Sequence, residues 1–176
     1  MLKGHLCSVR HLLSAELNTF IALANDLPSR GAYFSNQFKS PEALRKDFMQ
    51  TGFATDDSEL FVIEDSLHHI VGVITHFKGR TPACREIGYR LFEAGLAGRG
   101  YVTEATRLLI DYLFTAQQYH RLELLMDPLN IASERVAQKC GFSEEGRLRE
   151  LFFINGKFRD VKIYSLLRPE WEAQRG

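Results

Sequence analysis

The 176-residue chain lacks several features that mark particular classes of protein. No apolar stretch approaches the roughly 18 residues of a membrane-spanning helix, and residues 1–5 lead into no hydrophobic segment of the kind found in secretion signals. Lysine and arginine together equal aspartate and glutamate at 22 each, so the chain has no basic excess that would gather nucleic acid or anionic membrane. We therefore expect a cytoplasmic protein that binds neither.

Cysteine is also scarce. Cys7, Cys84 and Cys140 are odd in number and widely separated, which fits neither a disulfide framework nor a metal-ligand cluster. The six histidines show no ligand spacing either. We predict that no metal is bound and that the three cysteines are buried thiols, because a free cysteine packs as a small hydrophobic side chain.

The hydrophobic residues that are present suffice for one core. They make up 45% of the chain, and no repeat, low-complexity tract or linker divides it. We expect a single domain over residues 1–176.

Hydrophobic periodicity predicts a mixed α/β domain, with a largely antiparallel sheet in its first half and a helical crossover in its second. Ser40 and Pro41 are typical of a helix start, Gly141 of a helix end, and Asn155-Gly156 of a hairpin. The expected helices run from near 14 to before 28, from 41 to about 51, for about four turns after the glycines near 98, and over 132–139. The expected strands cover residues 6–10, 59–64, 69–77, 85–92, 121–127, 149–154 and 159–167.

The glycine-bearing segment implies a cofactor. Gly98 and Gly100 stand at the mouth of a strongly amphipathic helix, where free backbone amides and the positive end of the helix dipole favour a phosphate or pyrophosphate. A dinucleotide fingerprint is excluded because Thr103 replaces its third glycine, and a phosphate-binding Walker loop is excluded because no Gly-Lys-Ser/Thr follows. A tight helix entry that needs glycine for positive φ is the alternative.

Three segments in this order resemble the GCN5-related N-acetyltransferase (GNAT) superfamily. They are residues 86–91, residues 103–105 and residues 130–142, and the similarity covers most of residues 60–167. Within the superfamily they are most similar to the ribosomal-protein N-terminal acetyltransferases, the RimJ/RimL-like branch. The resemblance implies a single-domain α/β GNAT fold, with a mixed, mostly antiparallel sheet of about seven strands flanked by about four helices. Two splayed central strands would hold acetyl-CoA.

The resemblance also implies which residues hold acetyl-CoA. The family's cofactor motif is Gln or Arg, two residues, Gly, one residue, then Gly or Ala, and this chain has Ala97, Gly100 and Val102 there. Two of these three positions depart from the pattern, so we expect binding through backbone amides with weakened affinity. The implied contacts are Gly98, Arg99, Gly100, Tyr101, Val102 and Thr103 at the pyrophosphate, and Leu91, Phe92 and Asn130 along the pantetheine. The alternatives are a solvated loop arginine for Arg99 and a plain helix-entry residue for Asn130.

Two residues match catalytic positions of the family. Glu86 aligns with a glutamate that acts as general base in relatives, and strand alternation puts it on the same face as Gly88 and Arg90. Its alternative role is a surface salt bridge. Ser133 matches a serine that meets the departing sulfur as general acid, or else it satisfies a backbone amide at a helix start.

The acceptor is the least defined part. Tyr33, Phe34 and Phe38 lie in a loop that could enclose a substrate or simply pack on the core, and Phe152 stands where close relatives carry a second glutamate. We expect direct acetyl transfer to a primary amine, favouring a protein or peptide α-amine. A small amine (polyamine, amino acid or amine-bearing antibiotic) and a catalytically silent acyl-CoA-binding module are the alternatives. Monomer and homodimer are both left open.

Overall fold

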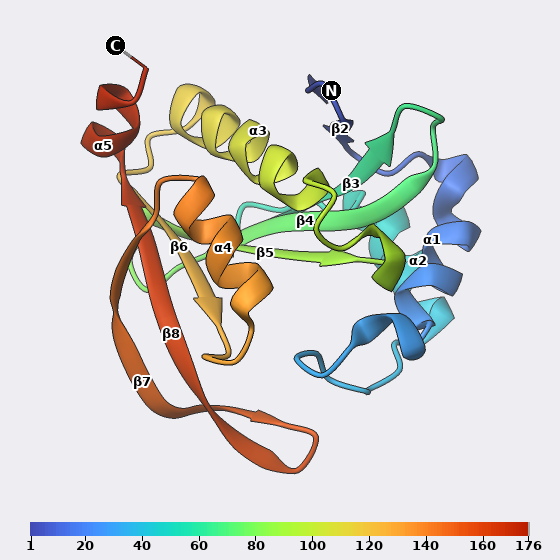
Figure 1. The fold of residues 1–176 in the computed structure, drawn as a ribbon. Coiled ribbons are helices and arrows are strands. Elements are labelled where there is room, and N and C mark those ends of the chain that lie inside the picture. Colours follow the sequence, from blue (N-terminus) through green and yellow to red (C-terminus); the bar gives the residue numbers. More distant parts are fainter. Residues whose placement is uncertain (176) are drawn as a thin grey trace.

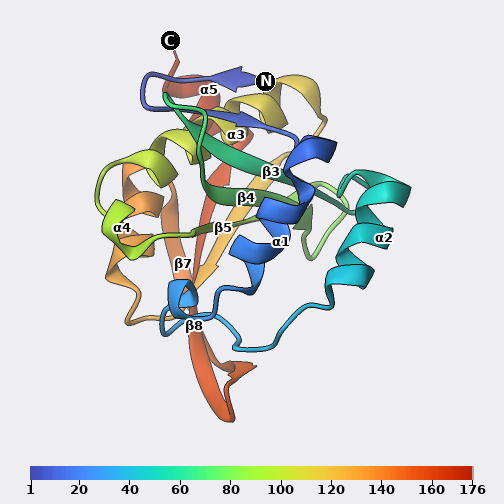
Figure 2. The same cartoon turned by 90° about the vertical axis from the view of Figure 1, so that its right-hand side faces the viewer.

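The computed structural model describes residues 1–175 and is organised around one eight-stranded sheet, in the order β1-β2-β3-β4-β5-β6-β8-β7 (Figure 1). Helices α3 and α4 cover one face, and α1 and α2 cover the other (Figure 2). The strands are β1 (Leu2–Lys3), β2 (Cys7–Arg10), β3 (Ser58–Asp65), β4 (Ile70–Lys78), β5 (Cys84–Leu91), β6 (Arg121–Met126), β7 (Ser143–Ile154) and β8 (Lys157–Leu167). The helices are α1 (Leu17–Asn25), α2 (Pro41–Thr51), α3 (Tyr101–Ala116), α4 (Ile131–Lys139) and α5 (Arg168–Ala173).

The predicted α/β class and sheet are confirmed. All neighbouring strands pair antiparallel except β5 and β6, which are parallel because α3 carries the chain across between them. The expected start of α2 is confirmed as well, since the Ser40 hydroxyl accepts a hydrogen bond from the Ala43 amide at 3.3 Å. Gly141 takes the predicted left-handed conformation, with φ of +82°.

The structure adds two elements that the pattern did not indicate and lengthens a third, β7. Strand β1 has only two residues and helix α5 only six, so neither is long enough to show a periodicity. Strand β7 begins at Ser143 rather than 149, and its first half is mostly exposed and polar, which leaves no alternation to detect. Asn155 and Gly156 form a two-residue turn with φ of +51° and +78°. The β7–β8 hairpin therefore projects below the body of the molecule (Figure 1).

Two buried clusters sandwich the sheet. The larger one packs α3 on the sheet through its apolar stripe of Ala105, Leu109, Ile110, Leu113 and Phe114. The smaller one joins α1 and α2 to the opposite face, and the side chains of Phe20, Phe48 and Phe92 belong to it. Among residues 1–175, no helix combines the length and apolar character needed to cross a membrane.

Glu104 ties the start of the chain to the first turn of α3. Its carboxylate accepts hydrogen bonds from the backbone amides of His5, Leu6 and Cys7, each at 2.8 Å. Burial acts to raise the pKa of the Glu104 carboxyl, but these three donors outweigh it and hold the pKa below its usual range. The N-terminal turn is thereby fixed beside Gly100.

We expect Glu104→Ala to lower the free energy of unfolding by about 2–3 kcal/mol. The substitution removes the carboxylate that accepts hydrogen bonds from the amides of His5, Leu6 and Cys7. Since the folded-state pKa is lowered, this contribution is present above the ordinary glutamate pKa and is lost as pH falls through the folded value. Urea unfolding at pH 7 and about pH 3 measures both effects. Glu172→Ala is the control, since that side chain makes no hydrogen bond within residues 1–175; an equal loss there would contradict the assignment.

Candidate functional site

The sheet opens at its centre, where β5 and β6 separate. They pair only through Cys84–Arg121, Arg85–Leu122 and Glu86–Glu123, although β5 continues to Leu91 and β6 to Met126. Past Glu86, the backbone groups on one edge of β5 therefore have no neighbouring strand. The loop before α3 and the start of α4 lie at the open end of this gap (Figure 1).

The glycine segment forms a tight turn at this opening. Gly98 and Gly100 have φ of +77° and +94°, a region that disfavours side chains, and α3 begins at the next residue. A Cβ at Gly100 would lie 3.1 Å from the Leu6 side chain. The backbone amides of Tyr101 and Val102 lie in the first turn of α3, where no helical carbonyl can accept from them. No other acceptor within residues 1–175 pairs with them.

These features make the turn a backbone cradle for an anion. Its unpartnered amides and the positive end of a 16-residue helix suit a pyrophosphate without help from side chains. Arg99 is exposed at its rim, and the amide of Thr103 completes the first turn of α3. The missing polar side chain at Ala97 therefore leaves the cradle's main donors in place.

Leu91 is the last residue of β5 and Phe92 follows it, and the two residues have different surroundings. The Phe92 amide donates to the Val71 carbonyl at 3.0 Å, so strand alternation turns the Leu91 amide toward the open gap. The Phe92 side chain is buried, 4% exposed, in the cluster beneath α1. Leu91 is thus the better placed of the two to pair with an extended ligand.

Helix α4 brings Asn130 and Ser133 to the same opening. Asn130 is the N-cap residue, and its side-chain oxygen accepts from the Ser133 amide at 3.1 Å. The Ser133 hydroxyl is free of that capping bond and instead lies 2.6 Å from the hydroxyl of Tyr89 on β5. The helix-start alternative therefore accounts for the serine amide and leaves its hydroxyl unexplained.

Tyr89 is a functional candidate that the sequence reasoning missed. Burial raises the pKa of its phenol, more than the hydrogen bond to Ser133 lowers it, so the phenol is protonated at neutral pH. Either hydroxyl can donate in this pair, and when Tyr89 donates to Ser133, the serine proton is left for a third group. Alternation along residues 84–91 carried a usable signal, because it places Tyr89 opposite Glu86 on the face of α4.

Glu86 lies on the other face of β5. It is half-buried, and burial together with the charge of Glu123 raises the pKa of its carboxyl to about 7, while Arg80 acts to lower it. Glu123 is itself buried and accepts from the Arg121 guanidinium at 2.7 Å. Glu86 forms no salt bridge within residues 1–175, so the surface salt-bridge alternative finds no support there.

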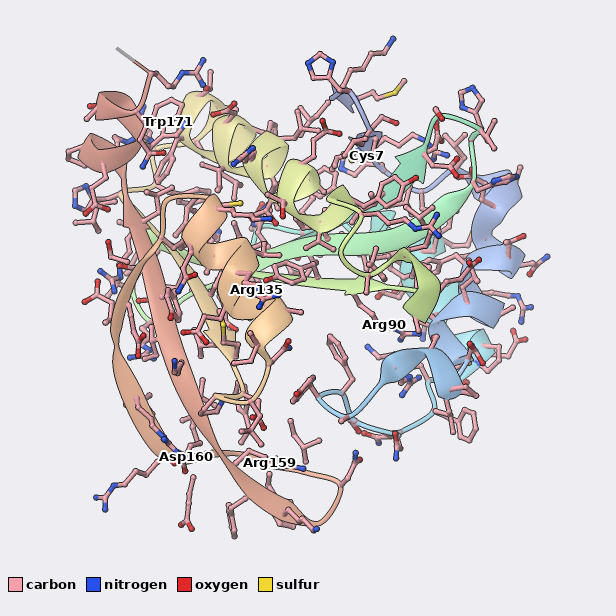
Figure 3. The ribbon with its side chains drawn as sticks, viewed as in Figure 1. Cys7, Arg90, Arg135, Arg159, Asp160 and Trp171 are labelled. Atoms are coloured by element: carbon pink, nitrogen blue, oxygen red, sulfur yellow. The ribbon has the colours of Figure 1, made fainter. Side chains whose placement is uncertain are left out.

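Strand β5 therefore separates two proton-handling groups. Arg90 faces α1, where it donates to the Leu23 carbonyl at 3.0 Å (Figure 3). Strand alternation puts Glu86 on this same face, whereas Tyr89 contacts Ser133 of α4 on the other. A carboxyl with a pKa near 7 exchanges protons readily at neutral pH. The hydroxyl pair on the opposite side is suited to donating one.

The loop over residues 28–40 closes the α1 and α2 side. The Tyr33 hydroxyl donates to the Leu129 carbonyl at 2.8 Å, next to the start of α4. Asn155, at the hairpin tip, donates to the Phe34 carbonyl at 3.2 Å and accepts from the Asn36 amide at 3.1 Å. Phe34 and Phe38 are 40% and 66% exposed and line a cavity, so they are not packed into the core.

The cysteines are buried and free, as predicted. Burial is the main cause that raises the pKa of Cys7 to about 12 and those of Cys84 and Cys140 to about 11, so none is a reactive thiolate. No cluster of three or more His, Cys, Asp or Glu side chains suited to a metal occurs in the part of the chain that the structure describes.

Comparison with known proteins identifies the family. Residues 8–143 match the model of the acetyltransferase (GNAT) domain. The chain is 30% identical to the probable N-acetyltransferase YjcK of Bacillus subtilis (strain 168), covering 98% of this chain and 99% of the relative. It is 27% identical to the spermidine N(1)-acetyltransferase of Vibrio cholerae, covering 93% and 94%.

A solved structure supports the fold. The RimL ribosomal L7/L12 alpha-N-protein acetyltransferase in complex with coenzyme A superposes with a TM-score of 0.81 at 18% identity, covering 93% of this chain and 95% of that one. The names of these two proteins thus give a polyamine acceptor for a sequence relative and a protein acceptor for a structural neighbour. The family match covers most of the chain and does not depend on which acceptor is used. The chain therefore belongs to the GNAT acetyltransferase family and is an acetyl-CoA-dependent N-acetyltransferase.

Proposed function

We propose that this protein transfers an acetyl group directly from acetyl-CoA to the α-amine of a protein or peptide. The observation that carries the proposal is the position of Glu86 and the Tyr89–Ser133 pair on opposite faces of β5, the strand that borders the central gap. An amine entering from the Glu86 side and a thioester lying along the gap would meet at this strand. Proximity then supplies much of the acceleration.

Acetyl-CoA would be held by the backbone cradle at Gly98, Gly100 and the first amides of α3, with Leu91 and Asn130 along its pantetheine. When bound, it supplies a thioester carbonyl that an amine can attack and a sulfur that leaves with the electron pair. The fit rests on amides without acceptors and on the two positive-φ glycines, one of which, Gly98, has no atom within 4 Å of where a Cβ would stand.

The protein's own residues then manage protons. Glu86, ionised above pH 7, takes the proton that the acceptor amine must lose, directly or through water. Ser133 gives its hydroxyl proton to the departing sulfur, and Tyr89 replaces it through the 2.6 Å contact. Glu86 then releases its proton to solvent and solvent restores the phenol, so each turnover moves one proton, in net terms, from the amine to the thiol.

An α-amine suits this arrangement better than a lysine-like amine. Its unperturbed pKa of about 8 lies near that of Glu86, whereas an alkyl amine near 10.4 needs a stronger base. Phe152 points the other way, because it stands where the ribosomal N-terminal acetyltransferases carry a second glutamate and so argues for an acceptor different from theirs. The spermidine acetyltransferase among the relatives favours the small-amine alternative, and loss of turnover with retained binding would favour a silent module.

The cofactor part of the proposal is tested at Gly100. Gly100→Val places a branched side chain at a φ of +94° against Leu6, so it should move the cradle amides and weaken acetyl-CoA binding at least tenfold, measured by calorimetry. Gly52→Val is the matched control, because Gly52 has a φ of +63° and lies at the end of α2, with open space around it. If folded Gly100→Val bound acetyl-CoA with unchanged affinity, the assignment of this turn as the pyrophosphate site would be contradicted.

The proton donor is tested with Ser133→Ala and Tyr89→Phe. Ser133→Ala should lower kcat about 10²-fold with little change in the KM for acetyl-CoA, because the contact forms mainly in the transition state. Tyr89→Phe should give a smaller loss in kcat, since it keeps the serine but removes its proton source. A loss confined to cofactor affinity would make these residues binding groups instead.

The base is tested by the pH dependence of kcat/KM. In the wild type, the rate with a peptide α-amine should fall as pH drops below about 7, because Glu86 must be ionised to accept a proton. Glu86→Gln should remove the part of this fall that Glu86 causes, leave the part caused by protonation of the α-amine itself near pH 8, and slow a lysine-like acceptor more than an α-amine. Equal losses for both acceptors, with unshifted profiles, would show that Glu86 only positions the amine.

A further inference from the structure

A cavity of about 630 Å³ lies on the α1 and α2 face of the sheet, beside the proposed transfer site. Its floor includes Thr75 of β4, the register partner of Gly88, and Arg90 and Phe92 at the end of β5. Its walls come from α1, α2 and the 28–40 loop. The lining is largely apolar, with an aromatic group formed by Phe20, Phe34, Phe38, Phe53 and Phe92.

Positive charge dominates the polar part of this cavity. Arg30, Lys39 and Arg90 line it, against a single carboxylate from Asp47 on α2. Arg30 is only 8% exposed, and neither it nor Arg90 forms a salt bridge within residues 1–175. Burial and the charge of Arg30 lower the pKa of Arg90, outweighing Asp26, which acts to raise it.

Part of this charge has a structural use. Arg30 donates to the carbonyls of Ala24 at 2.8 Å and Ser35 at 2.7 Å, and Arg90 to the carbonyl of Leu23 and the hydroxyl of Ser29. These bonds hold the loop against the C-terminal end of α1, where cations are favourable. Neutral carbonyls do not balance two guanidinium charges, however, and the Nε atoms of both arginines are buried without an acceptor.

We propose that the cavity binds the segment that follows the acceptor amine, and that this segment is apolar and carries a carboxylate. The inference rests on the proposed function, because it assumes that the amine lies beside Gly88, between Glu86 and Tyr89. A carboxylate would balance the arginine pair, and an apolar side chain would fill the aromatic walls. A polyamine would place further cations among three existing ones.

Strand geometry selects a peptide over a free amino acid. Arg90 follows Gly88 by two positions, which puts their Cα atoms about 7 Å apart along β5 at roughly 3.3 Å per residue, and the Arg90 guanidinium extends from there to the carbonyls of Leu23 and Ala24. The amine and carboxylate of an α-amino acid are separated by a single carbon and cannot span that distance. An acidic side chain on the second or third residue of a peptide can reach it.

The experiment measures kcat/KM for three peptide amides that share an apolar second residue and carry glutamate, glutamine or lysine at the third position. We expect the glutamate peptide to exceed the glutamine peptide about tenfold, as one charge-assisted hydrogen bond would give, with the lysine peptide lowest. Free phenylalanine and spermidine complete the panel. Both should be poor acceptors.

Lys39→Glu reverses one cavity charge without touching the bonds that hold α1, because its side chain is exposed and makes no hydrogen bond within residues 1–175. It should lower the rate with the glutamate peptide and raise that with the lysine peptide. Lys46→Glu, an equal charge change on α2 outside the cavity, should alter neither.

The outcomes separate the two proposals. No acetyl transfer to any amine would overturn the proposed function itself. Transfer to spermidine or to the lysine peptide ahead of the glutamate peptide would overturn the cavity's assignment and leave an active acetyltransferase. Free phenylalanine equal to the glutamate peptide would overturn the distance argument, and the same response in Lys39→Glu and Lys46→Glu would show only a long-range charge effect.

Discussion

The early separation of β5 from β6 is the constraint on which the rest of the structure depends. Parallel pairing stops after three residue pairs, and the remaining half of β5 keeps backbone groups that no strand satisfies. Unpaired backbone groups inside a sheet are costly unless a ligand or solvent binds them. The crossover through α3 creates this gap and also places the glycine turn at its open end, so one topological feature forms both the channel and the phosphate cradle.

The same strand divides the chemistry. Because successive side chains of a strand point to opposite faces, Glu86 and Tyr89 necessarily address different sides of the sheet. Burial raises the pKa of the Glu86 carboxyl and that of the Tyr89 phenol, but the two shifts have different chemical consequences. It makes the carboxyl of Glu86 a base that works near neutral pH and keeps the phenol of Tyr89 protonated as a donor. One environment thereby suits two opposite roles.

The acceptor side is assembled by long-range contacts. The 28–40 loop reaches Leu129 beside α4 and Asn155 at the hairpin tip, although these residues are 96 to 121 positions away in sequence. Arg30 and Arg90 hold the same loop to the end of α1. The cavity, its charge and its closure therefore share the same side chains, and a change in one alters the others.

Local patterns were sufficient to predict the α/β class, the four longer helices and the glycine turn, because helix caps, turn dipeptides and periodicity act over a few residues. The resemblance to GNAT enzymes then gave the sheet with splayed strands. Strand β1, helix α5 and the polar first half of β7 depend on pairing with distant segments and had no local signal. Likewise, sequence alone pointed to Glu86 and Ser133. The partnership of Ser133 with Tyr89, the effect of Glu123 on the pKa of Glu86 and the positive cavity exist only once the helices and β6 have packed around β5. Side-chain alternation is encoded locally, whereas burial and charge proximity are properties of the assembled sheet.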